Sequence, residues 1–392
     1  MAAPGKSLHV ELLHINSIHE FQGGVERQFE AVSDAFIEDG HSITMVSSSR
    51  AVSNEPLNPQ KSLVGLGIHS IARWWFIGPL LKLIRAYSAL RKQTHSPNFI
   101  ICPDPILAVA SKLARPKLPL FYRPGLCLKY SYNDNVSNEK GMMFSFLKHQ
   151  YFFIEKWALK KADGIICTSS QMKTQLSSIY RNNQFYVVNN PVSAAHINTP
   201  LSREKSDTLR FLYLGRLHKI KNVDLLLKAF AQLKLMNEDQ AISLHIAGTG
   251  QQEDELKQLA NSLMLQSSVQ FLGYCEHPID VLDQADILVM PSYYEPFGNV
   301  IPEAMSRGLI TLSFKSNNEH VLVGANDVVS NTIDGILINE PTVNGLLKAM
   351  QDIIKRPQFY DNFGTKAINK IQSNYSPEAI TRKYISIYHH DA

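Results

Sequence analysis

The sequence predicts an α/β protein made of two doubly wound domains. Short apolar runs rich in Val and Ile alternate with longer amphipathic segments, the pattern of parallel sheets covered by helices. At 392 residues the chain exceeds what one hydrophobic core usually organises. The stretch 193–208 is polar and lacks an apolar period, which is typical of a linker. We therefore expect one domain over 1–193, a second over 207–375, and a ligand cleft between them at the carboxyl ends of the strands.

The first half of the chain opens with a βαβ unit. Val25, Phe29, Val32 and Phe36 mark one face of a helix, and Gly40 ends it. A candidate strand lies on each side of this helix, which completes the unit. The candidate strands of the first half are 8–15, 42–47, 98–102, 118–122, 164–168 and 185–188.

A second series of strands and helices follows the linker. The final segment, 376–392, predicts a closing helix with Ser376 as its cap and Pro377 in its first turn. The candidate strands of the second half are 209–214, 242–247, 269–272 and 286–290, and its helices are 223–235 and 253–262.

Composition excludes several classes of protein. With 44% hydrophobic and 19% charged residues the chain is an ordinary globular protein, and its net charge of +4 is too small to indicate nucleic-acid binding. The start of the chain is too polar for a signal peptide, and no apolar run is long enough to span a bilayer. The four cysteines are scattered, and no two of them form a Cys-x-x-Cys motif, so neither a disulfide framework nor a zinc site is indicated. This pattern fits a reducing cytoplasm. The cysteines are Cys102, Cys127, Cys167 and Cys275.

The most informative feature is a pair of glutamates eight residues apart, Glu295 and Glu303. The apolar strand before them predicts that Glu295 lies on a loop at the mouth of a sheet, and a helix that starts after Gly298 places Glu303 in its first turns. Helix N-termini favour phosphates, whereas carboxylates accept hydrogen bonds from hydroxyls. One pocket could therefore hold a sugar, a ribose and a diphosphate. The other candidate substrate contacts of this segment are Phe297, Gly298 and Asn299.

Two cations follow the first strand of the second half. Arg216 and Lys221 stand five residues apart on one loop, where they can clamp both phosphates of a nucleotide diphosphate, Arg by its planar fork and Lys as a point charge. Such cations also stabilise the charge that builds on a departing diphosphate. Farther on, Gly248 and Gly250 form a Gly-x-Gly turn after a strand, which is compatible both with a ligand-binding loop and with a tight turn.

Together these segments resemble the retaining glycosyltransferases of family 4, which have the GT-B fold of two Rossmann-like domains with a cleft between them. The resemblance covers nearly the full chain and is strongest over 210–308. It implies that Glu295 contacts hydroxyls of the transferred sugar, that Glu303 binds the ribose, and that the final helix packs back on the first domain. Arg216 and Lys221 match the family's phosphate-binding cations.

Two further segments resemble landmarks of this family. Gly23 and Gly24 lie between the first strand and its helix, in a loop that the family uses near the donor's phosphates and the acceptor, and a flexible turn is the alternative. The run that ends at Tyr274 resembles the segment beside the nucleotide base, so Tyr274 is a candidate base contact.

Arg123 is a departure from the family pattern. Many relatives place a His that contacts the transferred sugar after the strand 118–122, whereas this chain has Arg123-Pro124-Gly125. An Arg cannot act as a general base near neutral pH. Because the resemblance implies that the leaving phosphate takes the acceptor's proton, the absence of that His need not abolish catalysis. Arg123 is kept as a candidate substrate contact. A second departure is Ile310 in the run Gly308-Leu-Ile-Thr311, where relatives usually have Pro after the Gly-x pair.

A basic, aromatic segment predicts contact with an anionic membrane surface. Three aromatic residues precede an amphipathic helix that carries several cations, a composition that suits a membrane interface. The alternative is a packed helix with a solvated basic face. The residues concerned are Trp74, Trp75, Phe76, Lys82, Arg85, Arg91 and Lys92.

The expected activity follows from the resemblance. It implies a retaining hexosyltransferase that moves a sugar from a UDP- or GDP-linked donor to a glycan or lipid-linked acceptor of the cell surface, in the cytoplasm or at the inner face of the membrane. No Asp-x-Asp triplet is present to hold a metal with the diphosphate, so we expect neither metal nor cofactor. The alternatives are a nucleotide-sugar epimerase or phosphorylase of the same fold, and a non-catalytic nucleotide-sugar-binding subunit.

Overall fold

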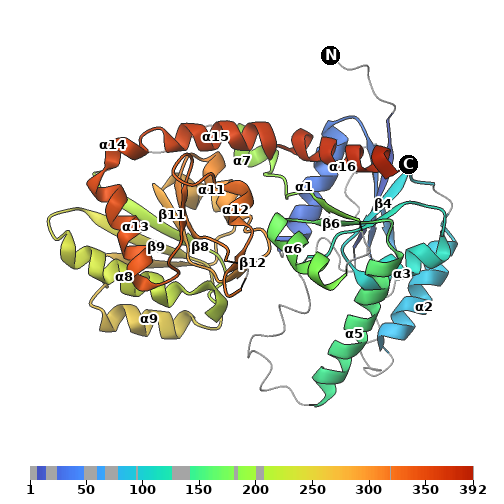
Figure 1. Ribbon diagram of the computed structural model, residues 1–392, viewed down its shortest axis with the longest axis horizontal. Coiled ribbons are helices and arrows are strands. Elements are labelled where there is room, and N and C mark those ends of the chain that lie inside the picture. Colours follow the sequence, from blue (N-terminus) through green and yellow to red (C-terminus); the bar gives the residue numbers. More distant parts are fainter. Residues whose placement is uncertain are drawn as a thin grey trace. The chain divides into compact units, whose positions relative to one another are not determined.

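The computed structural model divides the chain into two compact units (Figure 1). Unit 1 comprises Met1–Pro191 and Pro377–Ala392, and unit 2 comprises Val192–Ser376. The structure describes residues 7–14, 24–47, 60–66, 78–93, 96–125, 142–180, 184–199, 207–317 and 319–391.

Within its described residues, unit 1 is built on a 7-stranded parallel sheet in the order β3-β2-β1-β4-β5-β6-β7. The first strand, β1, pairs with β2 on one side and with β4 on the other, so the strand order reverses at this point, as in doubly wound folds. The strands are β1 (His9–His14), β2 (Ser42–Ser47), β3 (Lys61–Gly65), β4 (Phe99–Cys102), β5 (Leu120–Tyr122), β6 (Gly164–Cys167) and β7 (Phe185–Val187).

Two separate cores cover the two faces of this sheet. Alternate residues of β1 serve them, since Val10 and Leu12 enter the core under α1 and α16, whereas Leu13 enters the core under α2, α3 and α5. On that second face Arg115 donates to the buried carboxylate of Glu11 at 2.8 Å. The helices are α1 (Gly24–Glu38), α2 (Gly78–Arg91), α3 (Pro105–Ala114), α5 (Met142–Lys161), α6 (Ser170–Ile179) and α16 (Pro377–Asp391).

In the part of unit 2 that the structure describes, this topology is repeated in a 6-stranded sheet, order β10-β9-β8-β11-β13-β15. Its first strand, β8, pairs with β9 and with β11. A small sheet of β12 and β14 lies apart from it. The strands are β8 (Leu209–Leu214), β9 (Ile242–Ala247), β10 (Val269–Gly273), β11 (Ile287–Met290), β12 (Tyr294–Glu295), β13 (Ile310–Phe314), β14 (Leu322–Val323) and β15 (Ile336–Ile338).

The helices of unit 2 range from single turns to long amphipathic helices. A 3-10 turn, Lys219–Lys221, precedes the longest of them, α8. The helices are α7 (Ala194–Asn198), α8 (Val223–Met236), α9 (Glu253–Ser262), α10 (Pro278–Asp283), α11 (Val300–Ser306), α12 (Ala325–Val328), α13 (Val343–Lys355), α14 (Pro357–Tyr360) and α15 (Phe363–Asn374).

Part of the predicted linker, 193–208, forms a helix. Residues 194–198 form helix α7, which belongs to unit 2. The buried guanidinium of Arg307 holds this segment, since it donates to the carbonyl oxygens of His196 at 3.0 Å and Thr199 at 2.6 Å while it pairs with Asp283 at 2.7 and 2.6 Å. This polar segment is held to unit 2 by hydrogen bonds from Arg307 to its backbone carbonyl oxygens. A search of the sequence for apolar periodicity cannot detect such an attachment.

The closing helix α16 packs on α1 in unit 1, as expected. Its apolar side chains Ile380, Tyr384 and Ile387 complete the core on that face of the sheet. Tyr388 stacks on Phe99 of β4 with ring centroids 4.9 Å apart. Among the helices that the structure describes, none is both long and apolar enough to cross a bilayer.

Candidate functional site

The central contact of the site joins Lys221 and Glu295, whose Nζ and Oε2 atoms form an ion pair. The two side chains are only 11% and 22% exposed, so little solvent screens the pair. Lys221 follows β8 and Glu295 follows β11, the neighbouring strands at which the order of the unit 2 sheet reverses. Ligands of doubly wound sheets bind at the carboxyl ends of strands at such a switch point.

Two hydrogen bonds hold the loop after β8 against the loop after β11. The side-chain amide of Asn222 donates to the carbonyl oxygen of Pro291 at 3.0 Å, and the N–H of Tyr293 donates to the carbonyl oxygen of Ile220, also at 3.0 Å. Asn222 has φ 52° and ψ 40°, a left-handed conformation that Asn tolerates better than most side chains. These bonds flank Lys221 and fix its position relative to Glu295.

Backbone pairing and a glycine position Glu295. Residues Tyr294–Glu295 form β12 against Leu322–Val323, and the N–H of Gly324 donates to the Glu295 carbonyl oxygen at 2.9 Å. Gly298 has φ +81°, and a Cβ at this position would lie 3.0 Å from Cγ of Glu295. Glycine at 298 therefore lets the chain turn into α11 close beside the carboxylate.

Arg216 lies on the same loop as Lys221, and its side chain is exposed. The hydroxyl of the buried Tyr213 donates to the Arg216 carbonyl oxygen at 2.8 Å, which fixes the backbone there. Burial is the main cause that raises the pKa of Tyr213 well above its usual range; the negative charge of Glu295 raises it further, and the positive charge of Arg216 lowers it. Arg216 and Glu295 thus act on one common hydroxyl.

The second glutamate lies on α11. Glu303 is half-buried in the first turns of this helix, where its N–H donates to the Asn299 carbonyl oxygen at 3.1 Å and its own carbonyl oxygen accepts from Ser306 at 2.6 Å. Phe297 was expected to contact substrate, but its side chain is 3% exposed and packs in the core near Tyr375, with ring centroids 6.4 Å apart. Burial gives Phe297 a packing role.

The Gly-x-Gly turn joins two loops. A Cβ on Gly248 would lie 1.9 Å from the carbonyl oxygen of Gly215, and one on Gly250 would lie 2.2 Å from that of Leu217. Backbone hydrogen bonds link the same loops, from Leu217 to Thr249 at 2.9 Å and from Gly215 to Ala247 at 3.0 Å. Close backbone packing accounts for both glycines and supports the loop that carries Arg216.

The remaining candidates are placed as follows. Tyr274 follows β10 directly and is 61% exposed, so its ring is accessible. Gly24 is the first residue of α1, whereas Gly23 lies outside the described residues. The aromatic residues 74–76 also lie outside them.

Arg123 lies in the interior of unit 1. It is 3% exposed, its guanidinium contacts the side-chain amide oxygen of Asn190, and it stands 5.5 Å from the ring centroid of Phe29 on α1. It also acts on Tyr384 of α16, where burial raises the pKa of the hydroxyl and the charge of Arg123 lowers it. In this structure Arg123 therefore has a packing role within unit 1, because its charged group is enclosed by these neighbours, and its contact with substrate stays a prediction.

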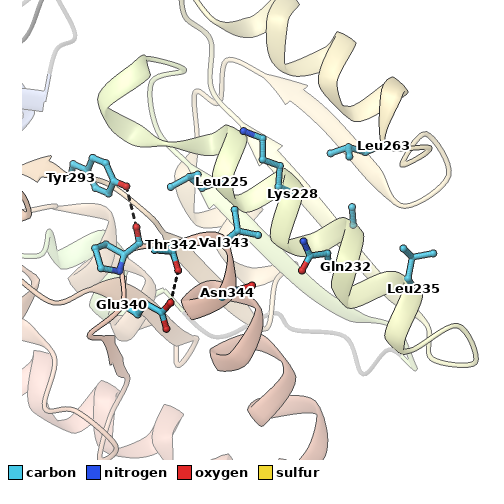
Figure 2. A pocket seen from close by; sticks show the side chains of 12 residues that line it. Leu225, Lys228, Gln232, Leu235, Leu263, Tyr293, Glu340, Thr342, Val343 and Asn344 are labelled. Atoms are coloured by element: carbon cyan, nitrogen blue, oxygen red, sulfur yellow. Dashed lines mark hydrogen bonds between the residues drawn. The ribbon is translucent and has the colours of Figure 1, made fainter.

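A groove of about 660 Å³ lies elsewhere in unit 2, between α8 and the start of α13 (Figure 2). Tyr293 donates to the Pro341 carbonyl oxygen at 3.0 Å at one end, and Thr342 donates to Glu340 at 3.1 Å. Its lining contains neither Lys221 nor Glu295. The described residues hold no group of three or more His, Cys, Asp or Glu placed to bind a metal ion.

Both halves of the chain match known protein-family models. Residues 22–196 match the model described as Glycosyltransferase Family 4, and residues 199–370 match the one described as Glycosyl transferases group 1. The chain is 24% identical to the glycogen synthase of Mycobacterium tuberculosis over 386 residues, which cover 93% of the chain and 91% of the relative. It is 23% identical over 232 residues, 58% of the chain and 64% of the relative, to the lipopolysaccharide core biosynthesis glycosyltransferase LpsE of Rhizobium meliloti.

Solved structures of similar fold cover nearly the whole chain. The sucrose-phosphate synthase from Thermosynechococcus elongatus aligns with a TM-score of 0.75 at 19% identity over 98% of both chains. HepE from Anabaena, solved in complex with UDP and glucose, aligns with a TM-score of 0.70 at 16% identity over 98% of this chain and 100% of its own. At these identities the similarity shows the fold.

Proposed function

The chain belongs to the family 4 glycosyltransferases of GT-B fold, and from this premise we propose that it transfers a sugar, with retention of configuration, from a nucleotide-diphosphate sugar to a glycan or lipid-linked acceptor. The acceptor is part of a cell-surface polysaccharide, and no metal ion takes part. The relative LpsE acts in lipopolysaccharide core synthesis by its name, and HepE was solved with UDP, which supports these assignments.

The ion pair of Lys221 and Glu295, with Arg216 on the same loop, is the observation that carries the proposal. The cationic and anionic groups suit neighbouring parts of one donor molecule, since phosphate oxygens bind Lys and Arg, whereas sugar hydroxyls donate to a carboxylate. In this assignment Glu295 holds the sugar next to the phosphates, and Glu303 on α11 binds the ribose.

The two cations supply the electrostatic part of catalysis. As the bond between the sugar and the diphosphate breaks, negative charge builds on the leaving phosphate, and Lys221 and Arg216 stabilise it. Lys221 is held in place by the hydrogen bonds of Asn222 and Ile220, so it needs little reorganisation when that charge develops. The leaving phosphate then takes the acceptor's proton, and the acceptor oxygen attacks on the face from which the diphosphate departs.

The decisive experiment follows the anomeric proton of the product. Purified protein is screened with UDP- and GDP-sugars for thermal stabilisation, because a specific ligand raises apparent stability by mass action. The stabilising donor is then incubated with glycolipid extract and a chelator, and proton NMR reads the product anomer. We expect retention and full activity with chelator.

Four outcomes contradict the proposal. An inverted anomer excludes retention, and activity that chelation abolishes and magnesium restores excludes metal independence. Donor turnover without any acceptor indicates an epimerase, whereas donor binding without turnover under all conditions indicates a non-catalytic subunit.

A further inference from the structure

The exposed apolar side chains of unit 1 gather on one group of helices. Among its described residues, the large hydrophobic side chains that face solvent lie on α2, α3 and α5 alone, and α3 packs against both α2 and α5 (Figure 1). They are Leu80 at 56%, Ile84 at 55%, Leu113 at 43%, Phe153 at 67% and Trp157 at 37% exposure. Exposed apolar residues that cluster on packed neighbours mark an interaction surface more clearly than scattered ones do.

The spacing of the exposed residues on α2 and α5 places them on one face of each helix. Leu80 and Ile84 lie one turn apart on α2, and Phe153 and Trp157 lie one turn apart on α5. Both helices bury other residues in the core beneath, among them Leu83 of α2 and Leu159 of α5. Each helix therefore has an inner apolar face that the core covers and an outer apolar stripe that no described residue of unit 1 covers.

The charges around these stripes are of one sign. Exposed cations flank them, and the acidic residue of α5, Glu155, is 3% exposed and turned into the core. Helices α2 and α3 contain no acidic residue, and Asp163, just after α5, is paired with Lys112 at 2.6 Å. The exposed cations are Arg85, Arg91, Lys92, Lys156, Lys160 and Lys161.

The opposite face of the same sheet carries charges of both signs, with acidic side chains on α1 and the cations Arg382 and Lys383 on α16. Helix α1 presents Glu30, Asp34 and Glu38 to solvent, and its core is the separate one completed by α16. Unit 1 thus has exposed cations and exposed apolar side chains together on one face of its sheet, and charges of both signs on the other. A planar anionic surface would orient such a unit with α2, α3 and α5 towards it.

We propose that the outer face of α2, α3 and α5 docks on an anionic lipid bilayer. Phe153, Trp157, Leu80 and Ile84 insert at the headgroup boundary, where aromatic and aliphatic side chains are favoured, while the flanking Lys and Arg contact lipid phosphates. A second copy of the chain fits this face poorly, because two such faces would bring like charges together. The proposal rests on the lipid-linked acceptor of the proposed function, yet binding to lipid requires no sugar transfer, so either can fail alone.

The test is co-sedimentation of the full chain with vesicles of phosphatidylcholine, with and without phosphatidylglycerol, at low and high salt. We expect most of the protein to sediment with anionic vesicles at low salt, and little with neutral vesicles or at high salt, because salt screens the attraction. Phe153→Ser/Trp157→Ser and Lys156→Glu/Lys160→Glu should each lower the bound fraction several-fold. The matched control is Leu235→Ser/Met264→Ser, which changes residues of unit 2 exposed at 72% and 85% and should bind as the unmodified protein does.

A second measurement reports insertion directly. In a Trp74→Phe/Trp75→Phe background Trp157 is the remaining tryptophan, and its emission should shift to the blue and be quenched by brominated lipid. Binding that is lost in this background without any effect of the α5 changes assigns docking to residues 74–76 and overturns the role of α5. An unmodified protein that stays in the supernatant, or a concentration-dependent dimer that the α5 changes disrupt, overturns the bilayer proposal. Unchanged thermal midpoints of the variants show that they fold.

Discussion

Asn222 and Pro291 are joined by a hydrogen bond of 3.0 Å from the side-chain amide of the first to the carbonyl oxygen of the second. The two residues belong to loops that follow different strands, β8 and β11. Lys221 directly precedes Asn222, and Glu295 lies shortly after Pro291 in the chain. Asn222 has two structural roles: its side chain makes this hydrogen bond, and its backbone adopts the left-handed conformation between the 3-10 turn and α8.

Substitution of Asn222 should separate these two roles. Asn222→Gly keeps the left-handed conformation and loses the hydrogen bond, which costs about 1 kcal/mol of unfolding free energy. Asn222→Ala also strains the backbone, for roughly 1 kcal/mol more. Urea denaturation measures both, and sugar transfer should fall in both variants because Lys221 loses its support. Full activity in Asn222→Ala would show that the bond does not position the site.

Arg216 and Lys221 should matter far more for turnover than cations on the surface away from the site do. We expect Arg216→Ala and Lys221→Ala each to lower kcat/KM by about 10²- to 10³-fold, the effect of one preorganised electrostatic contact. Lys348→Ala is the control, because that side chain is 75% exposed and should leave steady-state kinetics unchanged. Near-normal rates in both site variants would remove the phosphate-clamp assignment.

The two glutamates should divide their roles between sugar and nucleotide. Glu303→Ala should weaken binding of the free nucleotide, because a ribose contact exists without the sugar. Glu295→Ala should leave nucleotide affinity unchanged or tighter, since Lys221 loses its competing carboxylate, and should abolish transfer. Calorimetry with UDP and GDP separates the two effects. Equal nucleotide affinity of the unmodified protein and Glu303→Ala is the result that contradicts this division.

The loop glycines of unit 2 should differ sharply in how much stability a substitution by alanine costs. Gly248→Ala and Gly250→Ala place a Cβ against backbone carbonyl oxygens, which cannot move aside as side chains can, so we expect losses on the order of 3 kcal/mol. Gly273→Ala has open space around the new Cβ and φ +69°, so only backbone strain of about 1 kcal/mol remains. Denaturation midpoints test the order. Equal midpoints of the three variants would mean that the two loops separate without cost.

Glu155 should make stability depend on pH. Burial raises the pKa of this carboxyl from 4.5 to about 8, so the folded state keeps a proton that the unfolded state releases above pH 4.5. Stability therefore falls as pH rises between these values and levels off above about pH 8, by at most about 5 kcal/mol at roughly 1.4 kcal/mol per pKa unit. Glu155→Gln should remove this pH dependence, and at pH 8 this variant should unfold at a higher urea concentration than the unmodified protein does. Parallel pH profiles for both proteins would refute it.

Much of the fold could be predicted because apolar periodicity reports buried elements. The strands at Ser42–Ser47, Leu209–Leu214 and Ile242–Ala247 have the expected bounds, and each is largely enclosed by the core. Strand β3, Lys61–Gly65, was missed because it lies at the edge of its sheet and is mostly half-exposed, so it lacks the apolar run of a central strand.

The placement of single side chains was easier to predict from charge and spacing than from packing. Lys221 and Glu295 form an ion pair, and the charges of Glu295 and Arg216 both act on the hydroxyl of Tyr213, while the roles of these residues towards a substrate stay predictions. The burial of Phe297 and Arg123 was not predicted, because an aromatic ring in a core and an Arg enclosed by Asn190 and Phe29 look the same in sequence as exposed ones. Three buried polar groups were not foreseen, since their partners are far along the chain: the side chains of Asn222, Arg307 and Asp283.

The return of α16 to unit 1 determines the order in which the two units are completed during synthesis. Unit 2 is one continuous segment, Val192–Ser376, and can fold as soon as it has left the ribosome. Unit 1 is discontinuous, and its core under α1 lacks Ile380, Tyr384 and Ile387 until the nascent chain has been extended past them. The first part of the chain to be made is therefore the last to be completed, and during that interval the apolar side of α1 is a natural substrate for chaperones.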